Sequence, residues 1–271
     1  MKILSLCLIA LLLTVSFAAR AECESSGIGI VVMHGKGGSP ARHVAELASG
    51  LEANGICVAN LDMPWSARRS YDSDVRTTEK EVEAALDTLR SKGAKTLFVS
   101  GHSQGGLFAL HFGNAHHVAG IIAIAPGGNV GNAMFAEKLG DSVTRARQLV
   151  AEGKGNGKTQ LFDFESSKGL IPVVTTPAIF LDWFDPAGAM NQTEAVVHMA
   201  ADVPVLYVAP TNDYPALIKV NPAMFAALPR NPFSKFYQPN ATHIGSPAAS
   251  LDEILRWTRE VASRAGPQSA Q

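Results

Sequence analysis

The sequence lacks the motifs that would place it among metalloenzymes or nucleic-acid-binding proteins. It has neither a His-Glu-x-x-His string nor paired Cys-x-x-Cys strings, so we expect no metal and no cofactor. Its formal net charge is −1, and Arg68-Arg69 is too short a basic run to follow a phosphate backbone. No internal repeat is present. These absences give no indication of a nucleic-acid partner or of a metal site.

Long apolar runs are absent after the first 21 residues, so we expect no stable membrane anchor. At the start of the chain, Lys2 precedes an apolar run over residues 3–17, and the string Ala19-Arg20-Ala21 follows it. Small residues at the two positions that a signal peptidase inspects predict a signal peptide over 1–21, cleaved before Glu22. The sequence therefore predicts a secreted or periplasmic protein with one domain over 22–271.

Cysteine is scarce, with three in the whole chain. Cys7 lies in the predicted signal peptide, which leaves Cys23 and Cys57 for an oxidising compartment. Cys23 comes just before the first predicted strand and Cys57 lies at the start of the second, and we expect these strands to be neighbours. The pattern is compatible with a disulfide but does not decide whether it forms.

Short apolar runs alternate with amphipathic stretches of helical length, which is the pattern of βαβ units and a mostly parallel sheet. About 250 residues in this pattern are typical of one α/β domain with a single large core. Strands are predicted over 28–33, 56–61, 96–100, 118–125, 203–209 and 233–238. Helices that cover both faces of the sheet are predicted over 41–54, 75–92, 104–114, 193–200, 215–228 and 248–263.

One connection, over residues 127–191, is too long for a single crossover helix. It contains a predicted helix over 133–152, a glycine-rich turn over 153–157 and an aromatic-rich tract. The tract includes Phe162, Phe164, Phe180, Trp183 and Phe184. We interpret the insertion as a lid whose aromatic residues favour apolar substrates. Ordinary buried packing without substrate contact is the alternative for each aromatic residue.

The string Gly101-His102-Ser103-Gln104-Gly105 lies between a predicted strand and a predicted helix. A nucleophilic serine on such a sharp turn needs glycine on either side, because side chains there would collide with the folded backbone. A glycine-rich turn without chemistry is the alternative. The strand before and the helix after the string favour Ser103 as a catalytic nucleophile.

A second glycine-rich string, His34-Gly35-Lys36-Gly37-Gly38, ends the first predicted strand. Acyl transfer needs two N–H donors directed at the developing oxyanion. We expect one from the backbone of Gln104 and the other from Lys36, with Gly37 as the alternative. His34 is expected to order this loop and not to act as a base. A tight turn that simply requires glycine is the structural alternative.

Position along the chain selects the base among eight histidines, because reactive groups of an open α/β sheet collect at the carboxyl ends of its strands. His243 follows the last predicted strand and precedes the last predicted helix. His102 lies within the serine turn, and its side chain is expected to point away from the nucleophile. The other candidates fall on or beside predicted helices: His43, His111, His116, His117 and His198. We therefore expect His243 to be the base.

The partner of this histidine should be a carboxylate on a neighbouring strand-end loop. Asp213 follows the predicted strand over 203–209, in a turn between two prolines. The preceding strand ends in Pro126-Gly127-Gly128-Asn129 and offers no carboxylate. Asp182, Asp185 and Asp202 are the rivals. Asp213 is expected to be the acid.

The chain order Ser103, Asp213, His243, with a His-Gly-x-Gly-Gly loop upstream, resembles the α/β-hydrolase superfamily over nearly the whole chain after the signal peptide. The resemblance implies a sheet of up to eight strands, a lid, and hydrolysis of esters, thioesters or amides through an acyl-enzyme. One departure is visible: after the predicted signal peptide, the sequence reaches the strand before the glycine loop almost directly, so we expect the first two strands of the usual sheet to be missing.

The leading hypothesis is a serine hydrolase of the carboxylesterase type that cleaves small, apolar esters or thioesters without a cofactor. A peptidase or amidase using the same three residues is the alternative within enzymes. A binding protein that kept the fold and lost catalysis is the alternative outside enzymes. The filled triad positions argue against the last. The sequence does not predict the acyl or alcohol group, or the oligomeric state.

Overall fold

The computed structural model describes residues 23, 26–165 and 168–264. The predicted signal peptide over 1–21 lies outside these residues. Among the described helices, none combines the length and apolar character needed to cross a bilayer.

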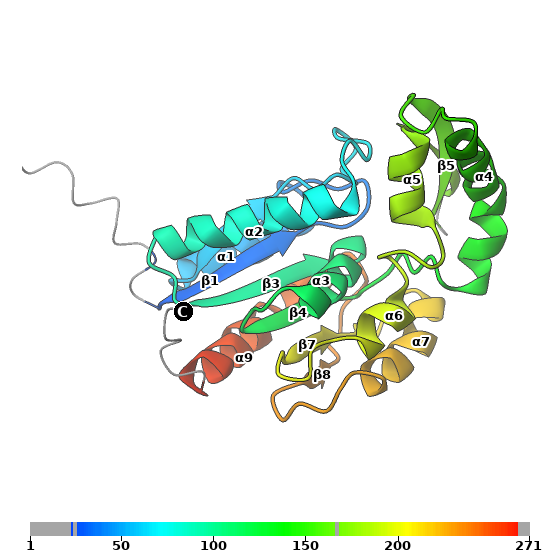
Figure 1. The fold of residues 1–271 in the computed structure, drawn as a ribbon. Coiled ribbons are helices and arrows are strands. Elements are labelled where there is room, and N and C mark those ends of the chain that lie inside the picture. The colour runs from blue at the N-terminus through cyan, green and yellow to red at the C-terminus, as the bar shows by residue number, and fades with distance from the viewer. Residues whose placement is uncertain (1–22, 24–25, 166–167, 265–271) are drawn as a thin grey trace, which may run out of the picture.

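A six-stranded, fully parallel sheet forms the centre of the molecule (Figure 1). Its strand order is β2-β1-β3-β4-β7-β8, so β7 lies between β4 and the last strand. The strands are β1 (Ile28–Met33), β2 (Cys57–Leu61), β3 (Thr96–His102), β4 (Gly120–Ile124), β7 (Val205–Val208) and β8 (Lys235–Tyr237).

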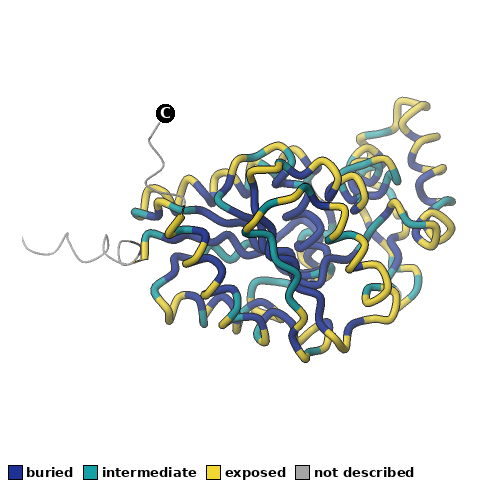
Figure 2. The backbone as a smooth tube through the Cα atoms, turned by 90° about the horizontal axis from the view of Figure 1, so that it is seen from below, coloured by how far each residue is buried: buried dark blue, intermediate teal, exposed yellow. Residues whose placement is uncertain are grey.

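Helices cover both faces of this sheet, because its apolar strands are buried on both sides. On one face, buried apolar side chains pack α1 (Ala45–Ala53) and α9 (Leu251–Arg264) against the strands. On the other face lie α2 (Val75–Ser91), α3 (Gln104–Ala115), α6 (Gln192–Val197) and α7 (Pro215–Ala226). Figure 2 shows the buried backbone concentrated in the strands between these layers. The predicted open α/β sheet of about six strands with helices on both faces is confirmed.

The helix predicted over 248–263 differs from the structure. It consists of a short α8 (Ser246–Ala249) followed by α9, with Ser250 between them. The Ser250 hydroxyl donates a hydrogen bond to the carbonyl of Ser246 at 2.7 Å, which competes with regular helix propagation.

The lid segment (residues 127–191) forms a lobe beside the sheet (Figure 1). It contains α4 (Ala133–Ala151), an antiparallel hairpin of β5 (Thr159–Glu165) and β6 (Gly169–Thr175), and α5 (Pro177–Phe184). The hairpin and α5 were not predicted. Asn132 caps α4, and Thr176 caps α5 with Pro177 in its first turn.

A disulfide joins Cys23 to Cys57, with 5.3 Å between the two Cα atoms. It connects a residue upstream of β1 to the first residue of β2, the neighbouring strand. The question that the sequence left open is therefore answered by the structure.

Candidate active site

Ser103 occupies the sharp turn between β3 and α3. Its backbone has φ 54° and ψ −117°, outside the regions that an L-residue usually adopts, and such strain concentrates at functional sites. A Cβ atom at Gly105 would lie 2.7 Å from the carbonyl oxygen of His34, and one at Gly101 would overlap the backbone of Gly105. Only glycine fits at these two positions, which is the physical reason for the sequence pattern.

The glycine loop after β1 lies directly against this turn. A Cβ atom at Gly35 would be 3.1 Å from the Cβ of Ser103. His34 holds the loop in place: its Nδ1–H donates to the Gly35 carbonyl at 2.8 Å, and its Nε2 accepts from the N–H of Met63 at 3.0 Å. Burial lowers the pKa of His34, which suits this neutral form. His34 is placed as a loop-ordering residue, as the sequence suggests.

The N–H groups expected to bind the oxyanion belong to Lys36, in the glycine loop after β1, and to Gln104, at the start of α3. The N–H of Gly37 donates to the carbonyl of Trp65 at 2.8 Å and is therefore occupied. Among the described residues, nothing accepts a hydrogen bond from the N–H of Lys36 or of Gln104, the first residue of α3. This arrangement favours Lys36 over Gly37 as the partner of Gln104.

His243 and Asp213 are brought together by two loops that pair with each other. Asn212 and Thr242 form a parallel bridge beyond the ends of β7 and β8. The Nδ1 atom of His243 lies 2.7 Å from Oδ1 of Asp213, and both residues are 7% exposed. Because Asp213 accepts at Nδ1, the Nε2 atom of His243 is left free to accept a proton.

Further contacts fix the backbone and ring of this histidine. The carbonyl of His243 accepts hydrogen bonds from Nε2 of His102 at 2.9 Å and from the Ser246 hydroxyl at 2.8 Å. The ring of Tyr214 packs on the His243 ring with centroids 4.8 Å apart. The side chain of His102 therefore reaches the histidine loop, a role that the sequence did not reveal.

The rival acids and bases have other partners. Asp182 accepts the N–H of Val75, Asp185 pairs with Arg147, and Asp202 lies 3.6 Å from His117 on the surface. His111 and His116 pair with glutamates of α2, and His198 pairs with Glu194 of its own helix. None of these contacts leads to Ser103.

Aromatic side chains of the lid segment are buried in contacts within the protein, whereas the sequence led us to expect them on a wall that contacts the substrate. Phe180, Trp183 and Phe184 are at most 3% exposed. Trp183 packs edge-on against Trp65, and Phe184 packs against Tyr71. These rings attach the lid to the loop after β2, which is the packing alternative. Phe162 is 38% exposed on the outer face of the hairpin.

A residue of α7 contributes apolar surface near the nucleophile instead. A Cβ atom at Gly127 would lie 3.6 Å from Oγ of Ser103 and 3.6 Å from Cδ1 of Leu217. Leu217 and Ser103 therefore face the same small space beside Gly127. Tyr214 and Ile218, at the start of the same helix, are 40% and 43% exposed.

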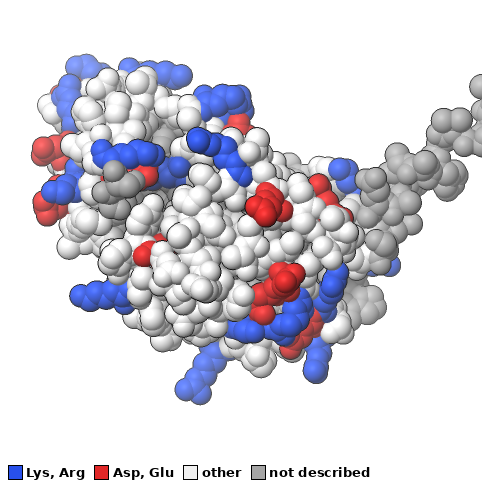
Figure 3. Space-filling model, turned by 180° about the vertical axis from the view of Figure 1, so that it is seen from behind, with Lys and Arg blue, Asp and Glu red and all other residues white. Residues whose placement is uncertain are grey.

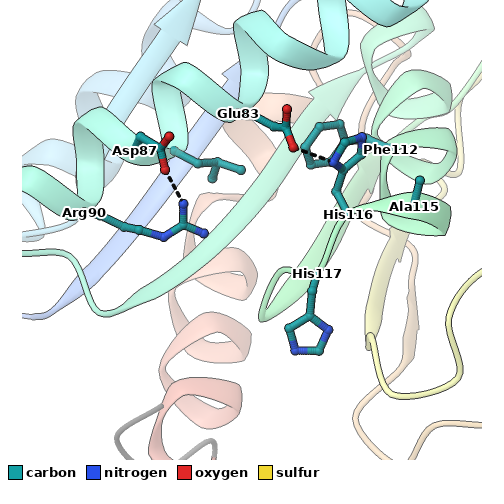
Figure 4. Close-up of a pocket in the computed structure, with 8 residues that line it drawn as sticks. Glu83, Asp87, Arg90, Phe112, Ala115, His116 and His117 are labelled. Atoms are coloured by element: carbon teal, nitrogen blue, oxygen red, sulfur yellow. Dashed lines mark hydrogen bonds and ion pairs between the residues drawn. The ribbon is translucent and has the colours of Figure 1, made fainter. Parts of the chain in front are cut away.

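A separate hollow of about 370 Å³ lies between the carboxyl-terminal parts of α2 and α3 (Figure 4). Figure 4 shows Glu83 paired with His116 and Asp87 paired with Arg90 along its wall. Ser103 precedes the opposite end of α3. Within the described chain, no group of three or more His, Cys, Asp or Glu side chains could hold a metal ion there or elsewhere.

Sequence comparison decides the family. Residues 30–265 match the profile described as the alpha/beta hydrolase family. The chain belongs to the alpha/beta hydrolase family. The match extends over β1, the Ser103 turn and the loops with Asp213 and His243. A search of curated proteins finds no match to this alpha/beta hydrolase.

Solved structures share the fold at low sequence identity. A monoacylglycerol lipase from Paleococcus ferrophilus is 17% identical, with a TM-score of 0.60 over 86% of this hydrolase and 94% of the lipase. The siderophore hydrolase EstB from Aspergillus fumigatus is 14% identical, with a TM-score of 0.57 over 87% and 91% of the two chains. Est1E from Butyrivibrio proteoclasticus, solved with ferulic acid, is 16% identical, with a TM-score of 0.55 over 87% and 88%.

Proposed function

We propose that this hydrolase cleaves carboxylic esters or thioesters through an acyl-enzyme formed on Ser103. The observation that supports the proposal most strongly is the hydrogen-bonded His243–Asp213 pair at the same sheet edge as a strained serine turn. A nucleophile, a base and an orienting carboxylate are the three groups that acyl transfer requires. The lipase and hydrolase names of structural neighbours point to the same reaction class.

In the proposed reaction, Ser103 Oγ attacks the substrate carbonyl while Nε2 of His243 removes the hydroxyl proton. Asp213 stabilises the imidazolium that forms. The N–H groups of Lys36 and Gln104 bind the oxyanion. His243 then gives the proton to the leaving alcohol or thiol, and water releases the acyl group by the same steps.

The proposed substrates are small and apolar, since Leu217 and Ser103 face the same space beside Gly127. Burial of aliphatic surface on such a wall contributes about 25 cal/mol per Å². Leu217→Ala should widen the space and shift the preferred acyl chain toward longer lengths. An unchanged preference across acetyl, butyryl and hexanoyl esters would remove Leu217 from the substrate wall.

We also propose a secreted or periplasmic location. The predicted signal peptide and the Cys23–Cys57 disulfide both support it, because disulfides persist in oxidising compartments. Mass spectrometry of the protein recovered from its native host would test it. A chain that starts at Glu22 is expected, and an uncleaved intracellular chain would contradict the proposal.

The reaction is tested with p-nitrophenyl esters of increasing chain length beside a matched panel of peptide p-nitroanilides. We expect turnover of the esters that is lost in Ser103→Ala. Faster turnover of the anilides would identify a peptidase or amidase. Absence of turnover on both panels, together with no reaction with a fluorophosphonate, would indicate a binding protein.

A further inference from the structure

A buried ion pair joins the lid to the glycine loop beside Ser103. Nζ of Lys36 lies 2.7 Å from both carboxylate oxygens of Asp163, and it also donates to the carbonyl of Phe164 at 3.1 Å. The Asp163 side chain is 3% exposed and the Lys36 side chain 15% exposed. The two residues are 127 positions apart in the sequence, on β5 of the lid and on the loop after β1.

The same carboxylate reaches the second expected oxyanion donor through Tyr71. The Tyr71 hydroxyl accepts from Nε2 of Gln104 at 3.1 Å, and it can donate its one proton either to Oδ2 of Asp163 at 3.4 Å or to Oε1 of Gln104 at 3.2 Å. Tyr71 is fully buried, and this burial, with the charge of Asp163, raises the pKa of its hydroxyl well above the usual value. The hydroxyl therefore keeps its proton and can connect the two side chains.

The backbone at Tyr71 and at the residue before it has an uncommon conformation. Ser70 and Tyr71 have φ values of 48° and 55°, a left-handed conformation that is uncommon outside glycine. The hydroxyl of Thr175, on β6, donates to the Tyr71 carbonyl at 2.6 Å. The strained pair is thus held from the lid side as well, and strain of this kind persists only when its surroundings determine it.

A charged pair is a costly way to attach a lid, since burying ions removes their hydration and an apolar contact of the same shape could hold as well. A buried ion pair does, however, specify one position, because a displaced lid separates the Lys36 ammonium from the Asp163 carboxylate. The aromatic rings of Phe135 and Phe184, both on the lid segment, lie 5.5 and 5.9 Å from the Lys36 ammonium and add cation–π attraction to the same contact.

We propose that Asp163 is a positioning residue that holds Lys36 directly, and Gln104 through Tyr71, in the geometry that binds the oxyanion. The inference rests on the proposed function, because it assigns the N–H groups of Lys36 and Gln104 to the oxyanion. The lid thereby completes the catalytic site from a distance, without touching the substrate.

The test compares Asp163→Asn with Asp182→Asn, a matched control on the same lid. Asp182 also docks the lid, through the N–H of Val75 at 2.6 Å, but it contacts neither donor residue. For p-nitrophenyl acetate we expect kcat of Asp163→Asn to fall roughly 10- to 100-fold, because misplaced oxyanion donors cost most of their contribution. KM for this small ester should stay within about threefold, since ground-state binding is not affected.

A second readout separates positioning from stability. The affinity for an aryl boronic acid, which forms a tetrahedral adduct on the serine, should fall by the same factor as kcat. Asp182→Asn should change kcat and boronate affinity by less than about threefold. Equal losses in both variants would overturn the proposal in favour of lid docking in general, and near-normal kcat in Asp163→Asn would overturn it outright.

Tyr71→Phe decides the question if Asp163→Asn does not fold. It removes one hydroxyl and keeps the ring packed against Phe184. A fall in kcat with an unchanged Tm supports the proposal, and an unchanged kcat overturns it.

If the wild-type protein neither turns over esters nor reacts with a fluorophosphonate, the proposed function fails and this inference falls with it. A reactive wild type with unaffected variants overturns the inference alone.

Discussion

His102 should make the folded protein sensitive to mild acid. Burial, with a smaller contribution from the charge of His243, lowers the pKa of His102 to about 3. Its Nε2 donates to the carbonyl of His243, and its Nδ1 is buried with no partner among the described residues. A second proton would have to sit on Nδ1, where nothing accepts it and where it would place a charge beside His243.

The size of the effect follows from proton linkage. An unfolded chain protonates a histidine near pH 6.5, whereas folded His102 stays neutral down to about pH 3. The unfolded state therefore binds more protons in this window, and stability is lost as the pH falls from 6.5 toward 3. Between pH 8 and pH 5, His102 alone should lower the free energy of unfolding by about 2 kcal/mol.

Urea unfolding of the wild type and of His102→Gln at pH 8 and pH 5 measures this loss. The glutamine amide can replace the Nε2 donor but does not titrate. The wild type should lose about 2 kcal/mol more than the variant between the two pH values. His198→Gln, an exposed histidine, is the control and should behave as the wild type. Equal losses in the wild type and His102→Gln would refute the reasoning.

Three further predictions concern the site and the disulfide. Asp213→Asn keeps the shape but removes the charge, so kcat for p-nitrophenyl butyrate should fall by roughly 10⁴; near-full activity would mean that the acid is misassigned. In Gly127→Leu the new side chain starts 3.6 Å from Oγ of Ser103, so kcat/KM should fall more than about tenfold at unchanged Tm. Normal turnover in Gly127→Leu would contradict the inference that the substrate uses the space beside Gly127. Replacing Cys23 and Cys57 with serine frees a 34-residue loop and should cost about 4 kcal/mol in urea unfolding. A cost below about 1 kcal/mol would contradict the expectation that the disulfide stabilises the folded protein.

The main sheet was predictable because its strands are short apolar runs between turn signals, and most of them are followed by one segment with a helical pattern. The hairpin of the lid was not. Asp163, a charged residue, is buried, while Phe162 and Leu170 are exposed, so the usual alternation of buried apolar and exposed polar positions is broken. Pro172 within β6 also argues against a strand, and it is tolerated because it faces solvent in a two-stranded sheet. The start of α5 did carry a signal, the Thr176-Pro177 cap.

The catalytic candidates were accessible from sequence for a different reason. The Ser103 turn has local glycine requirements, and His243 and Asp213 follow strand ends whose order along the sheet can be inferred. The contacts that support them were not accessible. The hydrogen bond from His102 to the His243 carbonyl joins residues 141 positions apart, and no local sequence pattern predicts such a contact.

The charges at the surface carried little information about the site. On the face shown in Figure 3, both signs of charge are present, and Lys and Arg side chains are most frequent at the upper left. Many belong to ion pairs along one helix, such as Arg256 with Glu253 and Glu260 on α9. Exposed pairs of this kind contribute at most about 1 kcal/mol each. The two carboxylates on which the proposals rest, Asp213 and Asp163, are buried instead.

The most direct test of the central claim is intact-protein mass spectrometry after reaction with a fluorophosphonate. Ser103 lies on a strained turn at the sheet edge that also carries the hydrogen-bonded His243–Asp213 pair, so the wild type should gain the mass of one phosphonyl group. Ser103→Ala should gain none, and His243→Ala should react far more slowly because the base is gone. Labelling that persists in Ser103→Ala would contradict the assignment of Ser103 as the nucleophile.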